Sequence, residues 1–304
     1  MTVLVFGGSG FIGSKVVECL MKNDVETLSC DIIASNITGQ NTKWIRTDIL
    51  ELSSIERIFF EYDVDTVLHL VGLPAIDYCE KNPHFSLLLN ALSVQNTLEA
   101  MRKADVKKIV FASSAAVYGY HSKVPVKETY PTNPTTIYGY HKLIAEHMIK
   151  SYNQSYGLNY VILRLFNVYG GEPEIGKDVI SIFIRRATKG LPVVVKGPNK
   201  YRDFVYINDV VNAFLKVALE DISNVTVNIG TGKMTTLQEI ANLVKKYFPK
   251  VDIKYEVPPD DGTGMIADVT LAKETLDFSP VDPQKGIYDH IASYANSAVE
   301  NSVS

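Results

Sequence analysis

Short apolar runs alternate with longer amphipathic stretches through about the first 165 residues of the chain. The runs do not alternate between apolar and polar positions, which is typical of strands buried on both faces of a parallel sheet. The stretches between them carry apolar residues at helical spacing. This order predicts βαβ units. The expected strands are residues 3–6, 26–29, 64–70, 108–112 and 160–165, and the expected helices are 12–23, 52–62, 83–102 and 137–156.

The pattern changes after Arg164, where a loop with two glycines and a proline begins at Gly170. Further on we expect helices at 179–188, 207–219 and 237–248 and strands at 192–196, 203–206 and 225–229, with turn-rich sequence from Pro249 and a loop at 258–262. These elements predict an α/β fold, a Rossmann-type doubly wound parallel sheet with a smaller α/β substrate-binding domain. The nucleotide-binding domain is expected at 1–165, joined by about 203–230, and the second domain at 166–202 and 231–304.

Three regularly spaced glycines follow the first expected strand and open the first expected helix. Gly7 permits a tight turn, Gly10 lets a pyrophosphate approach the backbone, and Gly13 lets the helix pack closely on the strand. The phosphates would then lie at the positive N-terminus of a helix that begins near Phe11 and Ile12. The pattern predicts a dinucleotide site.

An acidic residue at the end of the second expected strand indicates which dinucleotide binds. Asp31 lies about 20 positions beyond the glycines, where a carboxylate binds the adenosine ribose hydroxyls. Its charge would repel a 2′-phosphate, and Ile32 and Ile33 offer no arginine to receive one. The sequence therefore favours NAD over NADP. Asp48 has two open interpretations, an adenine contact or the N-cap of the helix that begins at Leu52.

A tyrosine and a lysine four residues apart carry the candidate chemistry. Tyr138 and Lys142 share one face of the expected helix 137–156. A free phenol has a pKa of about 10, which is too high for a good base near neutrality. The ammonium of Lys142, helped by a nicotinamide cation, is expected to lower the pKa of Tyr138, while the Ser114 hydroxyl shares the substrate's proton. This relay beside a hydride carrier predicts redox chemistry on a secondary alcohol.

Composition and charge exclude other classes of function. The chain has 304 residues, 46% of them hydrophobic, and a net charge of −4, which gives no electrostatic case for nucleic acid or an anionic membrane. No apolar run approaches the roughly 18 residues of a membrane span. The three cysteines are scattered, and the six histidines suggest no metal site, so we expect a reducing cytoplasm and no metal. His69 and His141 are expected in packing or solvent roles.

A set of short motifs occurs in one order along residues 2–230. They comprise Gly7 to Gly13, Asp31, Asp48 with Ile49, His69 to Gly72, Asn90, Ser113 to Gly119, Tyr138 with Lys142, Arg164 to Gly170, and Arg202 to Tyr206. In this order they resemble the extended short-chain dehydrogenase/reductase superfamily, specifically its NAD-dependent nucleotide-sugar epimerase/dehydratase branch. The similarity is looser toward the C-terminus.

The resemblance implies the chemical roles of four residues. Tyr138 would be the acid/base, and Lys142 would hold the nicotinamide ribose and tune Tyr138. Ser114 would hydrogen-bond the reacting sugar hydroxyl. Arg202 would grip the diphosphate of a nucleotide sugar, a role that suits a guanidinium fork.

The resemblance also implies the binding contacts. Phe166 and Asn167 would lie between nicotinamide and substrate, and Asn90 would support the loops under the phosphates. Substrate contacts are implied for Ser114, Tyr138, Asn167 and Arg202. Cofactor contacts are implied for Gly7, Gly10, Phe11, Ile12, Gly13, Asp31, Asp48, Ile49, Leu70, Val71, Gly72, Asn90, Ser113, Tyr138, Lys142 and Phe166.

Two alanines after Ser114 narrow the reaction. In the 4,6-dehydratases this stretch resembles Thr-Asp-Glu, and in the UDP-glucuronate decarboxylases a glutamate takes the second of those places. Ala115 and Ala116 cannot transfer protons, so the extra acid/base of elimination or decarboxylation is missing. What remains suits 4-epimerisation of UDP-glucose/galactose or their N-acetyl forms. A 4-keto-sugar reductase and a catalytically silent NAD(H)-sensing protein stay open as alternatives.

Two departures from the family pattern concern the substrate. Many members carry an arginine in an Arg-Pro-Gly-Asp-like loop, whereas this chain has Pro258-Pro259-Asp260-Asp261. The segment after His69 reads Leu73-Pro74, where several galactose epimerases have a lysine. Either other cations assist Arg202 or the nucleotide differs. The candidate cations are Arg185, Arg186 and Lys196.

Family members usually form homodimers by pairing two helices per subunit into a four-helix bundle. The expected helices 83–102 and 137–156 are the candidates in this chain. Some of their apolar residues must face the chain's own sheet. These residues are Leu87, Leu88, Leu92, Leu98, Ile144, Met148 and Ile149.

Overall fold

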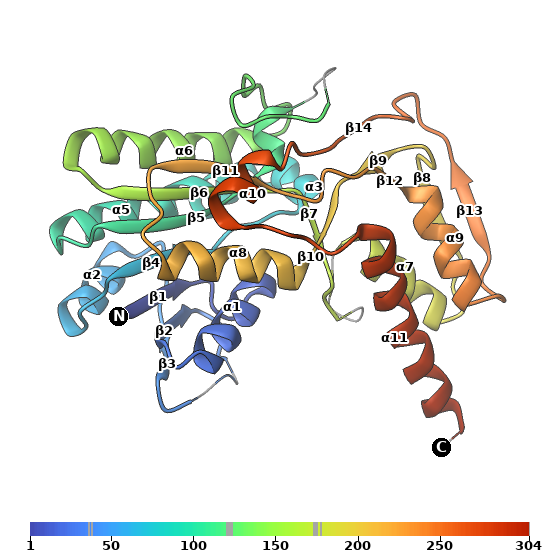
Figure 1. Ribbon diagram of the computed structural model, residues 1–304, viewed down its shortest axis with the longest axis horizontal. Helices are drawn as coiled ribbons and strands as arrows, with labels where there is room; N and C mark the ends of the chain where they lie inside the picture. The colour runs from blue at the N-terminus through green and yellow to red at the C-terminus, as the bar shows by residue number, and fades with distance from the viewer. Residues whose placement is uncertain (36, 38, 120–123, 173–175, 177, 304) are drawn as a thin grey trace.

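A seven-stranded parallel sheet with helices on both faces forms the larger part of the computed structural model (Figure 1). The structure describes residues 1–35, 37, 39–119, 124–172, 176 and 178–303. The strand order is β11-β6-β5-β4-β1-β2-β3. Strands β2 and β3 are added on one side of β1 and the later strands on its other side, so the order of addition switches between β1 and β4 as in a Rossmann fold. The predicted fold class is confirmed. The strands are β1 (Thr2–Phe6), β2 (Glu26–Asp31), β3 (Thr42–Arg46), β4 (Thr66–His69), β5 (Lys108–Ser114), β6 (Asn159–Leu165) and β11 (Val225–Ile229).

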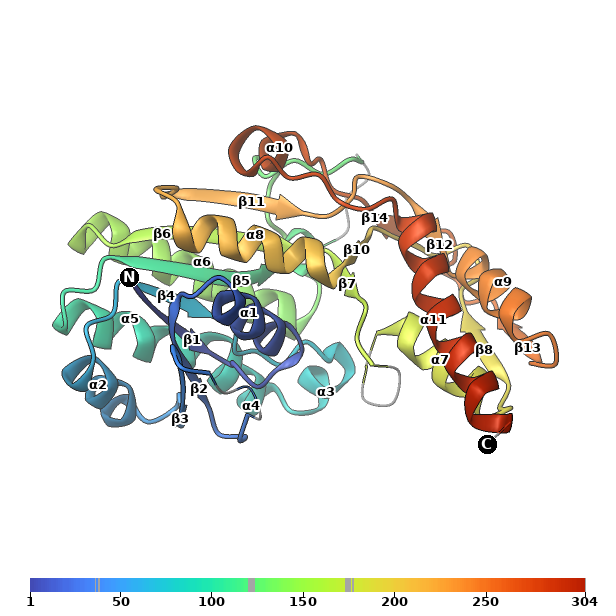
Figure 2. The ribbon, with the colours of Figure 1, turned by 60° about the horizontal axis from the view of Figure 1, so that its bottom comes forward.

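Helices pack on both faces of this sheet, so its central strands are buried on both sides. All five residues of β1 are buried, and Phe6 is in register with Cys30 on β2 and His69 on β4. One face is covered by α1 (Phe11–Lys22), α8 (Ile207–Leu219) and α10 (Thr270–Leu276). The other is covered by α2 (Leu52–Glu61), α5 (Ser93–Lys103) and α6 (Ile137–Tyr156). Figure 2 shows α1 and α8 lying together in front of the sheet.

A second, smaller group of elements lies at the other end of the molecule, around its own apolar core (Figures 1 and 2). Its helices bury Phe183, Ile240 and Ile287, among others, against a two-stranded sheet in which β8 and β13 are parallel. These elements are α7 (Val179–Thr188), β8 (Val193–Lys196), α9 (Leu237–Tyr247), β13 (Ile253–Glu256) and α11 (Pro283–Val303).

Short strands connect the two ends. The pair β7 and β10 is parallel, and β9 lies between β12 and β14 in a three-stranded sheet. After β10 the chain returns through α8 to β11, which pairs with β6 at the edge of the main sheet. The connecting strands are β7 (Asn167–Tyr169), β9 (Tyr201–Arg202), β10 (Phe204–Tyr206), β12 (Thr235–Thr236) and β14 (Gly264–Met265).

The single helix predicted at 83–102 is wrong in detail. The structure has α4 (Pro83–Leu87), a π-helical turn η1 (Leu88–Leu92) and then α5. The wider turn adds one residue to the helical cycle, and it carries Asn90 into the interior. A short helix α3 (Ile76–Lys81) precedes this segment.

The turn-rich region after Pro249 holds more helix than its composition indicates. The loop expected at 258–262 is present, but α10 and α11 follow it. The Asp282 carboxylate accepts hydrogen bonds from the backbone N–H groups of Gln284 and Lys285, at 3.0 and 3.2 Å, just after Pro283 at the first position of α11. An acceptor followed by a proline is a standard helix start.

Candidate active site at the carboxyl edge of the sheet

The glycine turn lies where β1 ends and α1 begins. Gly7 has a φ of 82°, and a Cβ added to it would lie 3.0 Å from the backbone of both Leu70 and Val71. A Cβ on Gly13 would lie 1.9 Å from the Gly7 carbonyl oxygen. Gly10 is the N-cap of α1 and places no side chain over the first turn, so the amide groups there remain open to an anion. The turn has the form that dinucleotide phosphates require.

Asp31, at the end of β2, is joined directly to this turn. Its carboxylate accepts hydrogen bonds from the backbone N–H groups of Ser9 at 3.1 Å and Ile33 at 3.0 Å. The Ser9 hydroxyl donates to the Ile33 carbonyl at 2.7 Å. The carboxylate therefore lies beside the phosphate turn, at the edge where β1 and β2 end.

Asp48 is not the N-cap of α2. The N-cap is Glu51, and the Asp48 carboxylate instead accepts a hydrogen bond from the backbone N–H of Leu50 at 2.9 Å. The side chain of Asp48 is exposed, whereas Ile49 packs into the core with 6% exposure. Asn96 on α5 donates to the carbonyls of Ile49 and Leu50 at 3.2 and 3.0 Å, which fixes this loop against the sheet.

The structure brings Ser114, Tyr138 and Lys142 together. Thr136 is the N-cap of α6 and accepts a hydrogen bond from the Gly139 N–H at 3.1 Å, so Tyr138 lies in the first turn and Lys142 one turn later. Both side chains are buried. Ser114 ends β5 and begins the 3-10 turn η2 (Ala115–Tyr118), and its hydroxyl hydrogen-bonds the Tyr138 phenol.

Burial, not the lysine, dominates the acidity of this group in the protein alone. Burial raises the pKa of Tyr138 to about 12, against the opposing hydrogen bond from Ser114. The expectation that Lys142 and a nicotinamide cation together lower the pKa of Tyr138 concerns the protein with its cofactor bound, and it stays a prediction. Burial also lowers the pKa of Lys142 to about 7, although the Glu146 carboxylate opposes the shift. In both side chains desolvation favours the neutral form.

The head of Lys142 is held between β5 and the loop that follows β4. Its Nζ donates to the backbone oxygen of Ala112 at 2.8 Å and lies 4.6 Å from the centroid of the Phe111 ring. A Cβ added to Gly72 would lie 3.0 Å from this Nζ and 3.1 Å from Oδ1 of Asn90. A side chain at position 72 would therefore have to displace the ammonium or the Asn90 amide by a few tenths of an ångström.

The side chain of Asn90 forms two hydrogen bonds with that loop. Its Oδ1 accepts from the Leu73 N–H at 2.9 Å, and its Nδ2 donates to the Leu73 carbonyl at 3.4 Å. Cys79 on α3 donates its thiol to the same carbonyl at 3.2 Å. We did not predict Cys79 from the sequence, because no spacing rule relates this thiol to a carbonyl six residues earlier in a loop.

The expected substrate residues lie on the connecting strands. Phe166 is 6% exposed. Asn167 on β7 donates from its backbone N–H to the Asp203 carbonyl at 3.0 Å. Arg202 on β9 donates to the carbonyls of Tyr201 and Thr263 at 2.8 and 3.4 Å. The backbone of Asn167 is therefore bonded to the residue that follows Arg202.

The Asp203 carboxylate hydrogen-bonds several segments next to Arg202. It is fully buried and accepts from the N–H groups of Thr231, Gly232 and Ala267 and from the Thr231 hydroxyl, at 2.6 to 3.0 Å. Burial raises the pKa of Asp203, while these hydrogen bonds oppose the shift. The segment after β11 and the segment after β14 are therefore both held by the Asp203 carboxylate.

The cations considered as helpers for Arg202 have other contacts. Arg185 donates to the Gly176 carbonyl at 3.0 Å, and Arg186 donates to the Pro192 carbonyl. Lys196 lies 3.8 Å from Glu256 on the surface. The loop at 258–261 meets a different lysine, Lys200, which forms an ion pair with Asp260 at 2.6 Å.

The described part of the chain contains no group of three or more histidine, cysteine or acidic residues able to hold a metal ion. Within the same residues, no helix is both long enough and apolar enough to cross a membrane.

Comparison with protein families shows to which family this chain belongs. A model of the NAD dependent epimerase/dehydratase family matches residues 3–230. This chain belongs to that family. The matched range runs from β1 to the end of β11 and so includes every strand of the main sheet.

Individual members of the family are similar along nearly their whole length. A provisionally named UDP-glucose 4-epimerase of Methanocaldococcus jannaschii is 40% identical over 294 residues, which cover 94% of this chain and 95% of that protein. The crystal structure of UDP-glucose 4-epimerase with UDP-glucose from Thermotoga maritima superposes with a TM-score of 0.89 at 32% identity, covering 98% of this chain and 99% of the other. The Thermus thermophilus UDP-glucose 4-epimerase in complex with NAD has a TM-score of 0.87 at 31% identity, covering 97% and 99%.

The predicted cofactor, NAD, is confirmed by family membership, and the geometry of this epimerase/dehydratase family member fits it. Gly7 and Gly13 leave no room for a Cβ between β1 and α1, and Gly10, the N-cap of α1, has no side chain to occupy the amides of the first turn. Asp31 is hydrogen-bonded to this turn at Ser9, and Gly72 lies beside Nζ of Lys142.

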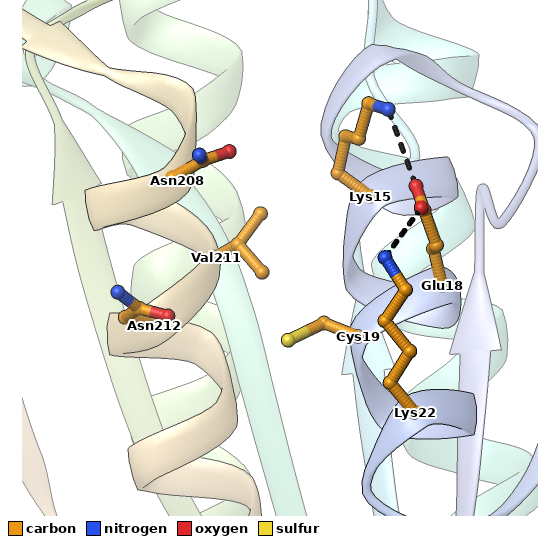
Figure 3. A pocket seen from close by; sticks show the side chains of 7 residues that line it. All are labelled: Lys15, Glu18, Cys19, Lys22, Asn208, Val211 and Asn212. Carbon is orange, nitrogen blue, oxygen red and sulfur yellow. Dashed lines mark hydrogen bonds and ion pairs between the residues drawn. The ribbon is translucent and has the colours of Figure 1, made fainter.

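A groove of about 430 Å³ between α1 and α8 is separate from this site (Figure 3). Its seven lining residues are Lys15, Glu18, Cys19, Lys22, Asn208, Val211 and Asn212. Glu18 pairs with both lysines, at 3.2 and 2.8 Å, so its carboxylate offsets part of the positive charge in the groove. No residue expected in catalysis or binding lines it.

Proposed function

We propose that this protein is an NAD-dependent 4-epimerase of nucleotide sugars, acting on UDP-glucose and UDP-galactose or their N-acetyl forms. One observation carries the proposal. Ser114, Tyr138 and Lys142 form a complete relay, and the two residues that follow Ser114 in η2 are alanines. A relay without a neighbouring acid/base oxidises a hydroxyl and reduces the ketone again, but it has no group for elimination or decarboxylation.

In this mechanism the relay moves the proton of the C4 hydroxyl. NAD, when bound, supplies the hydride acceptor and a positively charged nicotinamide ring. Burial raises the pKa of Tyr138 in the protein alone, so the phenol must lose its own proton before it can accept the proton of the sugar. Positive charge near its oxygen favours that loss, and we assign this charge to the nicotinamide ring together with the protonated form of Lys142. Ser114 holds the sugar hydroxyl against the phenol. The 4-ketose then turns in the pocket, and Tyr138 returns the proton when the other face is reduced.

The binding roles follow from the positions of the residues. We assign the phosphates of NAD to the amides around Gly10 and the first turn of α1, and the adenosine ribose to Asp31. Asp48 and Ile49 would contact the adenine. Residues 1–165 with about 203–230 would form the NAD-binding domain, and 166–202 with 231–304 the nucleotide-sugar-binding domain. Arg202 would bind the diphosphate, with Phe166 and Asn167 between the two ligands.

A homodimer built on α6 and the α4–η1–α5 segment is the proposed assembly. Large apolar side chains on both helical segments are exposed in the single chain, each by 39% to 50%. Pairing these faces across a twofold axis would give a four-helix bundle. The exposed residues are Leu87, Leu92, Tyr140 and Ile144. Because Cys19, Cys30 and Cys79 are all free thiols, we also propose a cytoplasmic location.

A substrate screen without added cofactor tests the proposed reaction. Purified protein is incubated with UDP-, GDP- and dTDP-sugars, and products are identified by NMR. An epimerase regenerates NAD in each turnover, so we expect UDP-hexoses to interconvert with no NAD added. A strict requirement for NADH or NADPH would instead indicate the 4-keto-sugar reductase.

A further inference from the structure

Two buried side chains outside the proposed catalytic set meet directly behind Lys142. Ser86 on α4 is fully buried, and His141, the residue before Lys142 on α6, is 9% exposed. The Oγ of Ser86 lies 2.9 Å from Nδ1 of His141. The sequence indicated a packing or solvent role for this histidine, and the contact contradicts the solvent role.

The hydrogen bond between Asn90 and Ser86 has a fixed direction. Because the Leu73 N–H must donate, the atom of Asn90 that receives it at 2.9 Å is Oδ1, and Nδ2 is then the atom that donates to Ser86 Oγ at 3.2 Å. The Ser86 hydroxyl can still either donate to Nδ1 of His141 or accept from it, and in both cases the two side chains are joined by one hydrogen bond. Burial lowers the pKa of His141, which favours its neutral form.

This chain of bonds ends on the loop that faces the Lys142 ammonium. It holds the peptide of Leu73, whose neighbour Gly72 lies so near Lys142 that an added Cβ would be 3.0 Å from Nζ. This series of hydrogen bonds therefore begins at the residue before Lys142 on α6. It ends at the loop that lies beside Nζ of the same lysine. A shift of this loop would move it relative to the ammonium.

We propose that His141 is a positioning residue, which through Ser86 and Asn90 fixes the Gly72–Leu73 loop against Lys142 and so shapes the nicotinamide-ribose end of the NAD site. The inference rests on the proposed function only for the role of Lys142. It assigns to His141 no contact with substrate or cofactor and no proton transfer in the reaction.

Substitutions at the two ends of the Ser86–His141 bond distinguish positioning from packing. His141→Leu keeps a side chain of similar bulk but removes the hydrogen-bonding nitrogen. His141→Asn keeps a hydrogen-bonding group, because its amide can accept through Oδ1 or donate through Nδ2. Ser86→Ala removes the bond to His141 from the other end, together with the bond from Asn90. His147 is exposed on the same helix, so His147→Leu is the matched control.

The measurement is the dissociation constant of NAD for the full-length protein, by titration calorimetry after bound NAD has been removed, together with KM and kcat for the sugar. We expect His141→Leu to weaken NAD binding about three- to tenfold, the range for loss of one buried hydrogen bond. Ser86→Ala also removes the hydrogen bond from Asn90, so it should weaken NAD binding at least as much. The double variant should bind NAD no more weakly than Ser86→Ala alone, because the serine substitution already breaks the bond to His141. His141→Asn and His147→Leu should bind NAD as the wild type does, and KM for the sugar should stay unchanged in all variants.

Equal NAD affinity in His141→Leu and His141→Asn would overturn the proposal, as would additive losses in the double variant. If His141→Leu fails to fold, Ser86→Ala and His141→Asn decide the same question. Failure of the proposed function is a separate result, because it appears as wild-type protein that binds NAD but leaves UDP-hexoses unchanged.

Discussion

The ammonium of Lys142 donates its hydrogen bond to the backbone oxygen of Ala112 at 2.8 Å, two residues before Ser114 on the same strand. The lysine is therefore attached to the strand that positions the serine, while its own helix positions Tyr138. All three members of the relay depend on the packing of α6 against β5. The Ala112 carbonyl and the Phe111 ring take the place of a carboxylate as the nearest groups to this charge.

The stability of the NAD-free protein should rise between about pH 7 and pH 10. Burial lowers the pKa of Lys142 from 10.5 to about 7, so in this window the unfolded chain binds a proton that the folded protein has lost. Raising the pH then favours the folded state, by up to about 1.4 kcal/mol per pH unit. Urea unfolding at pH 7, 8 and 9 measures the slope. Lys142→Met should flatten it, and identical slopes in the two proteins would show that another group titrates.

Replacing Tyr138 by phenylalanine should abolish turnover while NAD stays bound. The substitution removes the proton-transferring oxygen but keeps the buried ring, so we expect kcat to fall at least about 100-fold. NMR of the sugar products measures activity, and absorbance after denaturation measures NAD content. Sugar turnover at the wild-type rate in Tyr138→Phe would refute the catalytic assignment.

Breaking a buried ion pair near the relay should lower the free energy of unfolding far more than breaking an exposed one. Arg164 Nη2 lies 2.7 Å from the Glu146 carboxylate, and both side chains are at most 4% exposed. Glu146→Gln leaves the guanidinium without its countercharge and should cost about 3–5 kcal/mol in the free energy of unfolding. Asp289→Asn breaks the exposed pair with Lys285 and should cost under about 1 kcal/mol. Urea unfolding of both variants makes the comparison, and equal losses would contradict it.

Two alanine substitutions in the glycine turn should separate folding from cofactor binding. A Cβ at position 13 would lie 1.9 Å from a backbone oxygen, so Gly13→Ala should destabilise the NAD-free protein and lose NAD as well. A Cβ at position 10 would lie 3.2 Å from the same oxygen, at a φ of −77° that alanine adopts freely. Gly10→Ala should therefore keep its unfolding midpoint but bind NAD weakly, because its methyl group stands over the phosphate-binding amides. An unchanged NAD content in Gly10→Ala would place the phosphates elsewhere.

A charge on the exposed face of α6 should separate the subunits. Ile144 is 43% exposed in the single chain, and Ile144→Glu would bury a carboxylate in the proposed four-helix bundle. We expect a monomer in analytical ultracentrifugation. Phe60, on α2 and 90% exposed, provides the control, since Phe60→Glu should remain a dimer. A wild-type monomer would rule out the assembly.

The sequence was sufficient to predict six of the seven strands of the main sheet, all except the edge strand β3, because their signals are local. The buried strands, the glycine turn and the acid at position 31 each depend on residues near in sequence, and the structure places them as expected. The helix at 83–102 was predicted in the right place, but the π-helical turn at Leu88–Leu92 was not. Its register depends on Asn90 reaching the Leu73 loop, which is a tertiary requirement that periodicity does not record.

The chemistry of the relay was predictable in its residues but not in its acidity. The spacing of Tyr138 and Lys142 gave the shared helical face, whereas the direction of both pKa shifts depends on how much water the folded protein removes from them. The bond between Ser86 and His141 joins two helices 55 residues apart and has no signature in the sequence. Contacts of this kind require the packed structure.

The position of β11 at the edge of the sheet has a consequence for the order in which the protein is made. Until residue 229 has left the ribosome, β6 has no neighbour on that side, although the rest of the sheet is already synthesised. At about 5–20 residues per second the 64 residues from Leu165 to Ile229 take several seconds. During that time an apolar strand edge is open to other chains, so the nascent protein is a natural client for a chaperone at the exit tunnel.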